Sequence, residues 1–156
     1  MGNDFLPHFP ALNIRTTGID TILCVYKKVI GNSNDNIVNG SKIIWKNFRK
    51  IMIEIANTEE VLMHNEYKIR TKQSKNIMNR KMEESDRFVS VPMLDRSIEH
   101  YINPYEKHWQ ERYYNKLFKI DIDDDRRKQI SINYLEGLEW TLKYYTTGCV
   151  DWRWKY

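Results

Sequence analysis

The sequence predicts a mainly α-helical fold, in which an irregular N-terminal segment is followed by about four to five helices. Apolar residues recur every three to four positions along several stretches, which is the period of a helix with one buried face. Residues that favour helix starts precede these stretches, and glycines that favour helix ends follow them. The chain has 156 residues, of which 41% are hydrophobic and 13% aromatic, so it can form one domain or part of a larger one.

Residues 1–15 are rich in proline and aromatic side chains, so we expect them to be irregular. Thr17 is placed to cap a first helix that begins near Gly18, and Gly31 supplies its stop. The apolar face of this helix comprises Ile19, Ile22, Leu23, Tyr26 and Ile30.

The polar segment that follows ends in the turn signal Asn39-Gly40, so we expect a short strand or hairpin near Ile37–Ile44. Ser41 can cap a second helix. The apolar face of that helix comprises Ile44, Trp45, Phe48, Ile51, Met52 and Ile55.

Asn57, followed three residues later by Glu60, resembles a capping box and predicts the start of a third helix. This helix begins apolar and then becomes basic. Its cations lie in a stretch without acidic residues and are Lys68, Arg70, Lys72, Lys75, Arg80 and Lys81. Two interpretations remain open, an RNA-facing surface and a solvated, mobile helix, and we favour the second.

Residues 83–103 resemble a long connection interrupted by Pro92. Asn103 followed by Pro104 predicts the next helix start, because Asn caps a helix and proline is tolerated at its first position. The apolar face of this helix comprises Trp109, Tyr113, Leu117 and Phe118.

The last helix is expected to run from about Asp125 to Thr147 and to stop at Gly148. Its buried face is predicted to comprise Ile130, Tyr134, Leu138, Leu142 and Tyr145. Beyond the helix, aromatic residues alternate with cations from Trp152 to Tyr156, which predicts an extended segment with aromatics on one side.

An acidic run precedes this helix and consists of Asp121, Asp123, Asp124 and Asp125. It invites interpretation as a metal site, but adjacent side chains diverge and the EF-hand pattern is missing. We assign Asp123 or Asp124 instead to a favourable charge at the helix N-terminus.

Other patterns narrow the class of protein. The net charge of +4 is compatible with a polyanionic partner but not specific for one. Cys24 and Cys149 form no CxxC pair and indicate free thiols in a reducing compartment. The four histidines show no zinc spacing, and no nucleophile elbow, P-loop, dinucleotide fingerprint or HExxH motif occurs. Without a signal peptide or a membrane-length apolar run, we expect an intracellular protein with no membrane partner, cytoplasmic rather than nuclear.

Two parts of the chain resemble the XRN family of 5′→3′ exoribonucleases. The first is the string Gly2-Asn3-Asp4-Phe5-Leu6-Pro7-His8-Phe9-Pro10, followed by Leu12-Asn13-Ile14-Arg15 and Gly18-Ile19-Asp20. The second comprises Trp109, Arg112-Tyr113-Tyr114, Lys116, Phe118, Tyr134-Leu135-Glu136-Gly137-Leu138-Glu139-Trp140, Tyr144-Tyr145, Gly148 and Trp152-Arg153-Trp154. The motifs occur in family order, and only residues from about Lys68 to Ile102 match little.

The resemblance implies a helical part of a larger α/β nuclease. Residues 1–15 would be the edge of the catalytic domain, and residues 16–156 a helical domain that is incomplete at its C-terminus. The substrate would be single-stranded RNA with a 5′-monophosphate, hydrolysed with Mg²⁺ or Mn²⁺ in the complete enzyme. By residue match, Asp4 would be a catalytic metal ligand, and Trp152 or Trp154 would stack on an RNA base.

Four further interpretations follow from what the chain lacks. The family's other metal-binding carboxylates and its phosphate-gripping residues precede Gly2, so we expect this polypeptide to be inert, or nearly so, by itself. A separate chain could supply the catalytic region. The chain could instead be a stand-alone helical module that binds single-stranded RNA without catalysis, or a structural fragment without a ligand.

Overall fold

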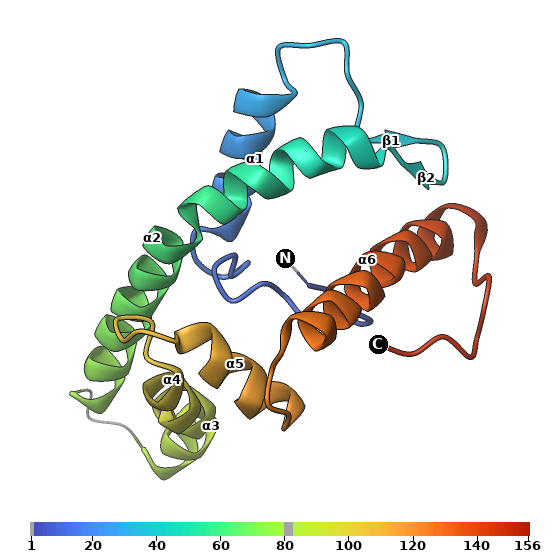
Figure 1. Cartoon of the computed structure of the whole chain (residues 1–156). Helices are drawn as coiled ribbons and strands as arrows, with labels where there is room; N and C mark the ends of the chain where they lie inside the picture. Colours follow the sequence, from blue (N-terminus) through green and yellow to red (C-terminus); the bar gives the residue numbers. More distant parts are fainter. Residues whose placement is uncertain (1, 80–82) are drawn as a thin grey trace. The chain divides into compact units, whose positions relative to one another are not determined.

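The computed structural model describes residues 2–79 and 83–156 and is mainly helical (Figure 1). The chain divides into two compact units. Unit 1 comprises residues 1–59 and 123–156, and unit 2 comprises residues 60–122. The predicted fold class is therefore confirmed, whereas several predicted element boundaries change.

Unit 1 contains helix α1 (Gly18–Val29), a hairpin of strands β1 (Val38–Asn39) and β2 (Lys42–Ile43), the first part of helix α2 (Trp45–Met78), and helix α6 (Asp124–Thr147). Strand β2 lies against α6. The buried apolar side chains of unit 1 come from the N-terminal segment, from α1 and its C-terminal cap, and from α2. They are Leu6, Ala11, Leu12, Val25, Ile30, Ile51 and Ile55. The irregular N-terminal segment is therefore part of the core of this unit.

The predicted hairpin is confirmed. Strands β1 and β2 are antiparallel, with Val38 opposite Ile43 and Asn39 opposite Lys42. Gly40 has a φ of 58° and is the first of two turn residues, a position where type II′ hairpin turns take glycine. The hairpin also explains why the second helix starts later than Ser41 indicated: residues 42–43 are used in β2.

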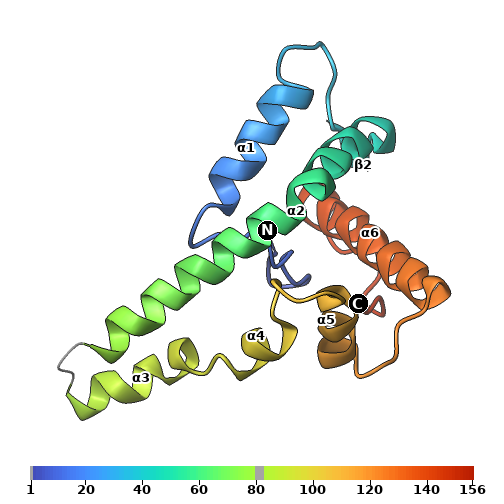
Figure 2. The same ribbon diagram turned by 60° about the vertical axis from the view of Figure 1, so that its left-hand side comes forward.

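Helix α2 is one unbroken helix, which corrects the prediction that a third helix starts at Asn57 (Figures 1 and 2). The Thr58 hydroxyl donates to the carbonyl oxygens of Glu54 and Ile55 in the preceding turn. Neither glycine nor proline occurs between Trp45 and Met78. The capping-box pattern thus falls inside a helix that nothing in its sequence interrupts.

Unit 2 contains the second part of α2 and three more helices: α3 (Glu84–Leu94), α4 (Ser97–Ile102) and α5 (Trp109–Phe118). Helices α4 and α5 pack against each other. The prediction of a long connection over residues 83–103 is wrong, because α3 and α4 occupy most of it. The proline that suggested a loop lies within α3.

The helix start predicted at Asn103 and Pro104 is also wrong, since α5 begins at Trp109. Asn103 ends α4 with a φ of 38°, and its side chain donates to the Glu106 carboxylate, with an N–O distance of 2.8 Å. His108, with a φ of 63°, precedes α5. Asn103 therefore closes one helix instead of opening the next.

The loop between α4 and α5 is held by the Arg112 guanidinium. This group donates hydrogen bonds to five backbone carbonyl oxygens, those of Tyr101, Ile102, Asn103, Glu106 and Lys107. The N–O distances range from 2.7 Å to Lys107 to 3.3 Å to Glu106. Because the planar guanidinium has five donors in a fixed geometry, it suits such a ring of carbonyls.

Ion pairs of Glu99 join α4 to α2 within unit 2. Arg96 is buried, and its Nε atom lies 2.6 Å from Oε2 of Glu99, while its Nη1 donates to the Thr71 hydroxyl. The other carboxylate oxygen of Glu99 accepts from Arg70 at 2.9 Å. The Arg96 guanidinium also lies over the Tyr67 ring, 4.8 Å from its centroid.

Helix α6 agrees closely with its predicted limits. The Asp123 side chain accepts a hydrogen bond from the Arg126 backbone N–H at 2.8 Å, which makes Asp123 its N-cap. Gly148 follows the last turn with a φ of 94°. The predicted buried face is shifted, however: Gly137 and Thr141 are buried, whereas Tyr145 is 63% exposed.

Several apolar side chains lie on the surface of each unit. In α1, Leu23 is 60% exposed although it belongs to the predicted apolar face, and in α3, Phe88 is 82% exposed. Within the described parts of the chain, no helix is both long enough and apolar enough to span a bilayer.

Candidate functional site

The Gly-Asn-Asp motif forms a tight turn stabilised by its own asparagine. The Asn3 side-chain oxygen accepts hydrogen bonds from the backbone N–H groups of Phe5 and Leu6, each at 2.9 Å. The Asn3 backbone N–H donates to the Leu6 carbonyl at 3.0 Å. Asn favours such turns because its short amide can replace a backbone partner. Asp4 lies within this turn and is exposed.

Gly2 is required by the same turn. Its φ is 83°, and a β-carbon at this position would lie 2.7 Å from the backbone nitrogen of His8. A side chain would therefore be strained by the backbone conformation and would collide with the chain six residues further on. The residue types of the motif are explained locally by this turn.

The residues after Asp4 attach the turn to α6. Phe5 makes an edge-on contact with Trp140, with ring centroids 5.0 Å apart, and a second with Tyr144 at 4.8 Å. Leu6 is buried and approaches Gly137. The segment runs antiparallel to the helix, because residues further along it meet earlier turns of α6.

Tyr134 continues this series of contacts toward the start of α6. Its hydroxyl donates to the Pro7 carbonyl at 2.9 Å, and its ring lies 5.0 Å from that of Phe9. Burial, assisted by the neighbouring Tyr156 hydroxyl, raises the pKa of Tyr134 to about 12. The hydroxyl therefore stays protonated, and able to donate to Pro7, even as the pH rises past 10.

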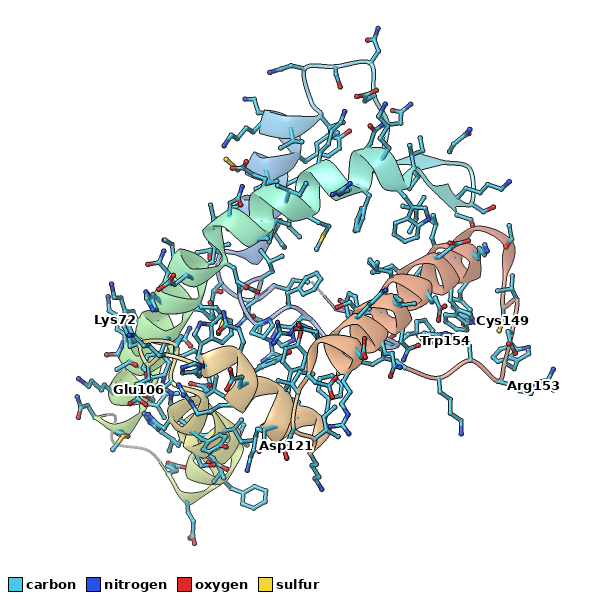
Figure 3. All side chains as sticks on the ribbon, viewed as in Figure 1. Lys72, Glu106, Asp121, Cys149, Arg153 and Trp154 are labelled. Atoms are coloured by element: carbon cyan, nitrogen blue, oxygen red, sulfur yellow. The ribbon has the colours of Figure 1, made fainter. Side chains whose placement is uncertain are left out.

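The C-terminal segment returns along the same helix. Trp154 stacks on Trp140 with ring centroids 5.6 Å apart and an interplanar angle of 21°. Tyr156 contacts Tyr134 edge-on, and the Trp140 indole N–H donates to the Asp151 carbonyl at 2.9 Å. Figure 3 labels Trp154 beside α6.

Trp152 does not share this packing. It is 83% exposed, whereas Trp154 is partly buried. The Asp151 carboxylate accepts a hydrogen bond from the Arg153 backbone N–H at 2.8 Å and so forms a turn. This turn corrects the predicted extended segment, because it breaks the alternation and separates Trp152 from the aromatics that face α6.

The other tryptophans, two of which were predicted to lie on apolar helix faces, differ in how fully they are packed. Trp109 is buried at 8% exposure, and Trp140 is at the centre of the α6 contacts. Trp45 contacts Phe48 edge-on at 5.8 Å but remains 39% exposed.

Among the residues that the structure describes, no cluster of potential metal ligands surrounds Asp4. Throughout residues 2–79 and 83–156, no group of three or more His, Cys, Asp or Glu side chains could hold a metal ion. The acidic run at residues 121–125 supplies a helix cap at Asp123 and an exposed pair of Asp124 with Arg127, with an N–O distance of 3.6 Å. Carboxylate oxygens are the ligand type that Mg²⁺ and Mn²⁺ prefer, and the Asp4 side chain is exposed.

The predicted basic stretch separates into cations of different kinds. Lys68, Lys72 and Lys75 are exposed on the part of α2 that belongs to unit 2. Arg70 is instead paired with Glu99. Arg80 and Lys81, the last two cations of the stretch, lie outside the described residues.

Sequence reasoning did not identify the contribution of Gly137. A β-carbon there would lie 2.6 Å from Cδ2 of Leu6 and 2.6 Å from Cη2 of Trp154. Both segments thus reach α6 at the point where it lacks a side chain. A glycine within an otherwise uninterrupted helical pattern is the signal that could have indicated close packing.

These features agree with a family match. The chain matches the family described as Xrn1 helical domain over residues 1–100 and over residues 89–156, and it belongs to that family. Both the turn around Asp4 and the segment with Trp152 fall within the matched regions.

Curated relatives match the same region. The chain is 25% identical over 198 residues to "5'-3' exoribonuclease 2 homolog" of Drosophila melanogaster, with 99% of this chain and 22% of the relative covered. It is 25% identical over 222 residues to "5'-3' exoribonuclease 2" of Gallus gallus, with 100% and 23% covered. A shorter match of 54 residues to the Caenorhabditis briggsae homolog is 46% identical and covers 34% of this chain and 6% of the relative. The chain thus spans about a quarter or less of the relatives it matches.

The longer alignments also show a difference in length. They extend over 198 and 222 positions, whereas this chain has 156 residues. These relatives therefore contain residues within the region that have no counterpart here.

Proposed function

We propose that this chain is the helical part of a 5′→3′ exoribonuclease that hydrolyses single-stranded RNA bearing a 5′-monophosphate. The observation that carries the proposal is the turn in which Asn3 holds Asp4 exposed. Family membership and the names of the relatives support it. The two segments that bear Asp4 and Trp152 are both anchored on α6, so one helix positions both candidate groups.

We assign Asp4 the role of one ligand of a divalent cation, Mg²⁺ or Mn²⁺. When bound, such cations activate water and stabilise the leaving oxygen in phosphodiester hydrolysis. Asp4 alone provides too few oxygen ligands for that chemistry. The remaining carboxylates would come from other parts of the complete enzyme or from a separate chain, so we expect this polypeptide alone to be inert or nearly so.

We assign base stacking to Trp152 in preference to Trp154. One face of the Trp154 indole is used by Trp140, whereas Trp152 is 83% exposed and therefore accessible to a base. Stacking on an aromatic contributes about 1–3 kcal/mol per base and tolerates every sequence. Such tolerance suits an enzyme that degrades RNA irrespective of sequence.

A digestion assay tests the assignment of Asp4. The purified chain is incubated with 5′-monophosphorylated single-stranded RNA and Mg²⁺, with and without a polypeptide that carries the N-terminal portion of the Drosophila relative. We expect digestion only when both are present and its loss in Asp4→Asn. Asp86→Asn, which makes the same charge change at an exposed position of α3 outside the family motifs, should digest normally.

Each outcome has a distinct meaning. Robust digestion by the chain alone would contradict the proposed dependence on further carboxylates. Digestion that persists in Asp4→Asn would contradict the ligand assignment. Failure of the combined polypeptides to digest RNA would contradict the proposed contribution to an exoribonuclease.

The second candidate function is single-stranded RNA binding without catalysis. The exposed Trp152 and the exposed lysines of α2 favour it. A titration with RNA that carries either a 5′-phosphate or a 5′-hydroxyl separates the two functions. A binding module without a phosphate pocket should bind both ends equally and show no digestion in any combination.

A further inference from the structure

Unit 2 contains an open hollow along the second part of α2, with a volume of about 580 Å³. Lys68, Lys72 and Lys75 line it. At a rise of about 1.5 Å per residue, Lys68 and Lys72 are about 6 Å apart along the helix axis, and Lys72 and Lys75 about 4.5 Å. The three ammonium groups therefore occupy one face over about two turns. Lys72 is labelled on this part of α2 in Figure 3.

The three lysines carry charge that the described residues do not neutralise. No carboxylate within residues 2–79 and 83–156 lies within 4.0 Å of their ammonium nitrogens. The neighbouring Arg70 differs, because it is bound to Glu99. A row of solvated cations on one helix face attracts a polyanion and releases counterions when the polyanion binds.

The other residues of the hollow favour a nucleic acid over an acidic peptide. Asn76, Asn79 and Thr71 add neutral donors and acceptors, which commonly contact phosphate and sugar oxygens. Tyr67 and Tyr105 add aromatic surface, and Tyr105 is 50% exposed. Positively charged grooves with aromatic side chains are typical of single-strand binding sites, whereas an acidic peptide carries no bases to stack on those side chains.

The aromatic side of the hollow is rigidly built. The Tyr105 ring stacks on His64 with centroids 4.2 Å apart and an interplanar angle of 4°, and its hydroxyl donates to the His64 carbonyl. The His64 ring bonds to the Pro104 carbonyl at 2.9 Å, and the Tyr67 hydroxyl bonds to Nδ1 of His100 at 2.8 Å. The two tyrosines are therefore held in place beside the lysines before any ligand arrives.

We propose that this hollow is a second RNA-binding surface, at which Lys68, Lys72 and Lys75 contact consecutive stretches of the single-strand backbone. This inference rests on the proposed RNA substrate, and it is separate from Asp4 and Trp152, which belong to unit 1. Such a surface would hold RNA without reading its sequence, because phosphate contacts carry no base information.

The test is fluorescence anisotropy of the full 156-residue chain with a labelled, 5′-phosphorylated oligouridine in EDTA, over a series of salt concentrations. The variant Lys68→Gln/Lys72→Gln/Lys75→Gln should bind at least about tenfold more weakly at low salt, and its slope of log affinity against log salt should be shallower by about 2, since each single-strand phosphate contributes about 0.7. The matched control is Lys27→Gln/Lys42→Gln/Lys128→Gln, which removes the same charge at exposed positions of unit 1. It should retain most of the affinity and the slope.

Several results would overturn the inference. Equal losses in the two triple variants would show that only overall charge matters, and unchanged binding by the Lys68/Lys72/Lys75 variant would remove the hollow from the binding surface. Displacement of the RNA by polyglutamate as effectively as by unlabelled oligouridine would show that the hollow has no preference for a nucleic acid over an acidic peptide. Failure of the unmodified chain to bind RNA would also overturn it.

The variant Trp152→Ala distinguishes this inference from the proposed function. If the lysine triple variant alone loses affinity, the hollow is supported regardless of the stacking assignment. If Trp152→Ala alone loses affinity, the hollow is rejected while the stacking assignment stands. The digestion assay with Asp4→Asn judges the proposed function independently of both titrations.

Discussion

The end of the Trp154 indole occupies the space above Gly137, where a β-carbon would lie 2.6 Å from the Cη2 atom of the indole. The Leu6 side chain reaches the same glycine at the same distance. Gly137 therefore allows the N-terminal and C-terminal segments to contact α6 together. Helix interiors disfavour glycine relative to alanine by about 1 kcal/mol, so close packing must offset this cost.

Gly137→Ala should destabilise the chain despite the better helix propensity of alanine. Overpacking typically costs about 1–3 kcal/mol, which exceeds the propensity gain in most of that range. The free energy of unfolding in urea measures the change, and tryptophan emission should report greater solvent exposure of Trp154. Glu136→Ala, at the exposed neighbouring position, is the control and should be near neutral or slightly stabilising. A Gly137→Ala chain more stable than the original would contradict the packing described here.

Tyr134 should make stability depend on alkaline pH. Its pKa is raised from 10 to about 12 in the folded chain, so the protonated hydroxyl is favoured by folding. The stability that this group contributes is fully present below pH 10 and is lost as the pH rises through about 12. Urea unfolding measured across that interval should show the loss, and it should be smaller in Tyr134→Phe.

At neutral pH, Tyr134→Phe removes the hydrogen bond to the Pro7 carbonyl and should cost about 0.5–1.5 kcal/mol. Tyr145→Phe removes the same atom from a side chain that is 63% exposed, and it should change stability little. Equal effects of the two substitutions would show that the Pro7 contact contributes nothing specific.

Arg112→Lys should loosen the loop between α4 and α5. Lysine keeps the charge but cannot direct donors to five carbonyl oxygens at once. Because several charge-assisted hydrogen bonds are lost, we expect destabilisation by more than about 2 kcal/mol. Amide hydrogen exchange should accelerate over residues 101–108. Arg127→Lys alters only an exposed ion pair, with an N–O distance of 3.6 Å, and should leave exchange there unchanged.

Glu59→Gln should stabilise the chain at neutral pH. Burial raises the pKa of Glu59 above its ordinary value of 4.5, because the charged form loses solvation. The fold therefore favours the protonated carboxyl, and this contribution is present below pH 4.5 and lost as the pH rises above it. The gain from glutamine should be clear at pH 7 and shrink toward pH 4.5 in thermal unfolding. Glu60→Gln, at an exposed position, should show no such trend.

Elements with local signals could be predicted from the sequence. Asp123 and Gly148 set the ends of α6 through their own backbone and side-chain bonds, and Gly40 sets the hairpin turn. None of these three signals depends on residues distant in the sequence. The same reasoning failed at Asn57, because a capping pattern does not end a helix when neither glycine nor proline interrupts it. The Asn103-Pro104 pattern alone could not show that Asn103 ends α4 instead of starting the next helix.

The candidate site was predictable in residue type but not in arrangement. The motif identified Asp4, yet the reason for its exposure is the Asn3 turn, a hydrogen-bonding detail. The alternation of aromatic residues and cations predicted that Trp152 and Trp154 lie on the same side of an extended segment. The turn formed by Asp151 separates them instead. The grouping of three lysines with Tyr105 requires residues 30 to 37 positions apart to meet, and periodicity within one helix carries no such information.

The antiparallel contacts along α6 restrict where this region can gain or lose residues during evolution. Phe5 meets Trp140 while Pro7 meets Tyr134, and Trp154 and Tyr156 repeat that order from the other segment. One residue inserted between Tyr134 and Trp140 would rotate the rest of the helix by about 100°. Neither segment could then keep its contact with Tyr134 and its contact with Trp140 at the same time. Insertions and deletions should therefore accumulate in the loops and spare this part of α6.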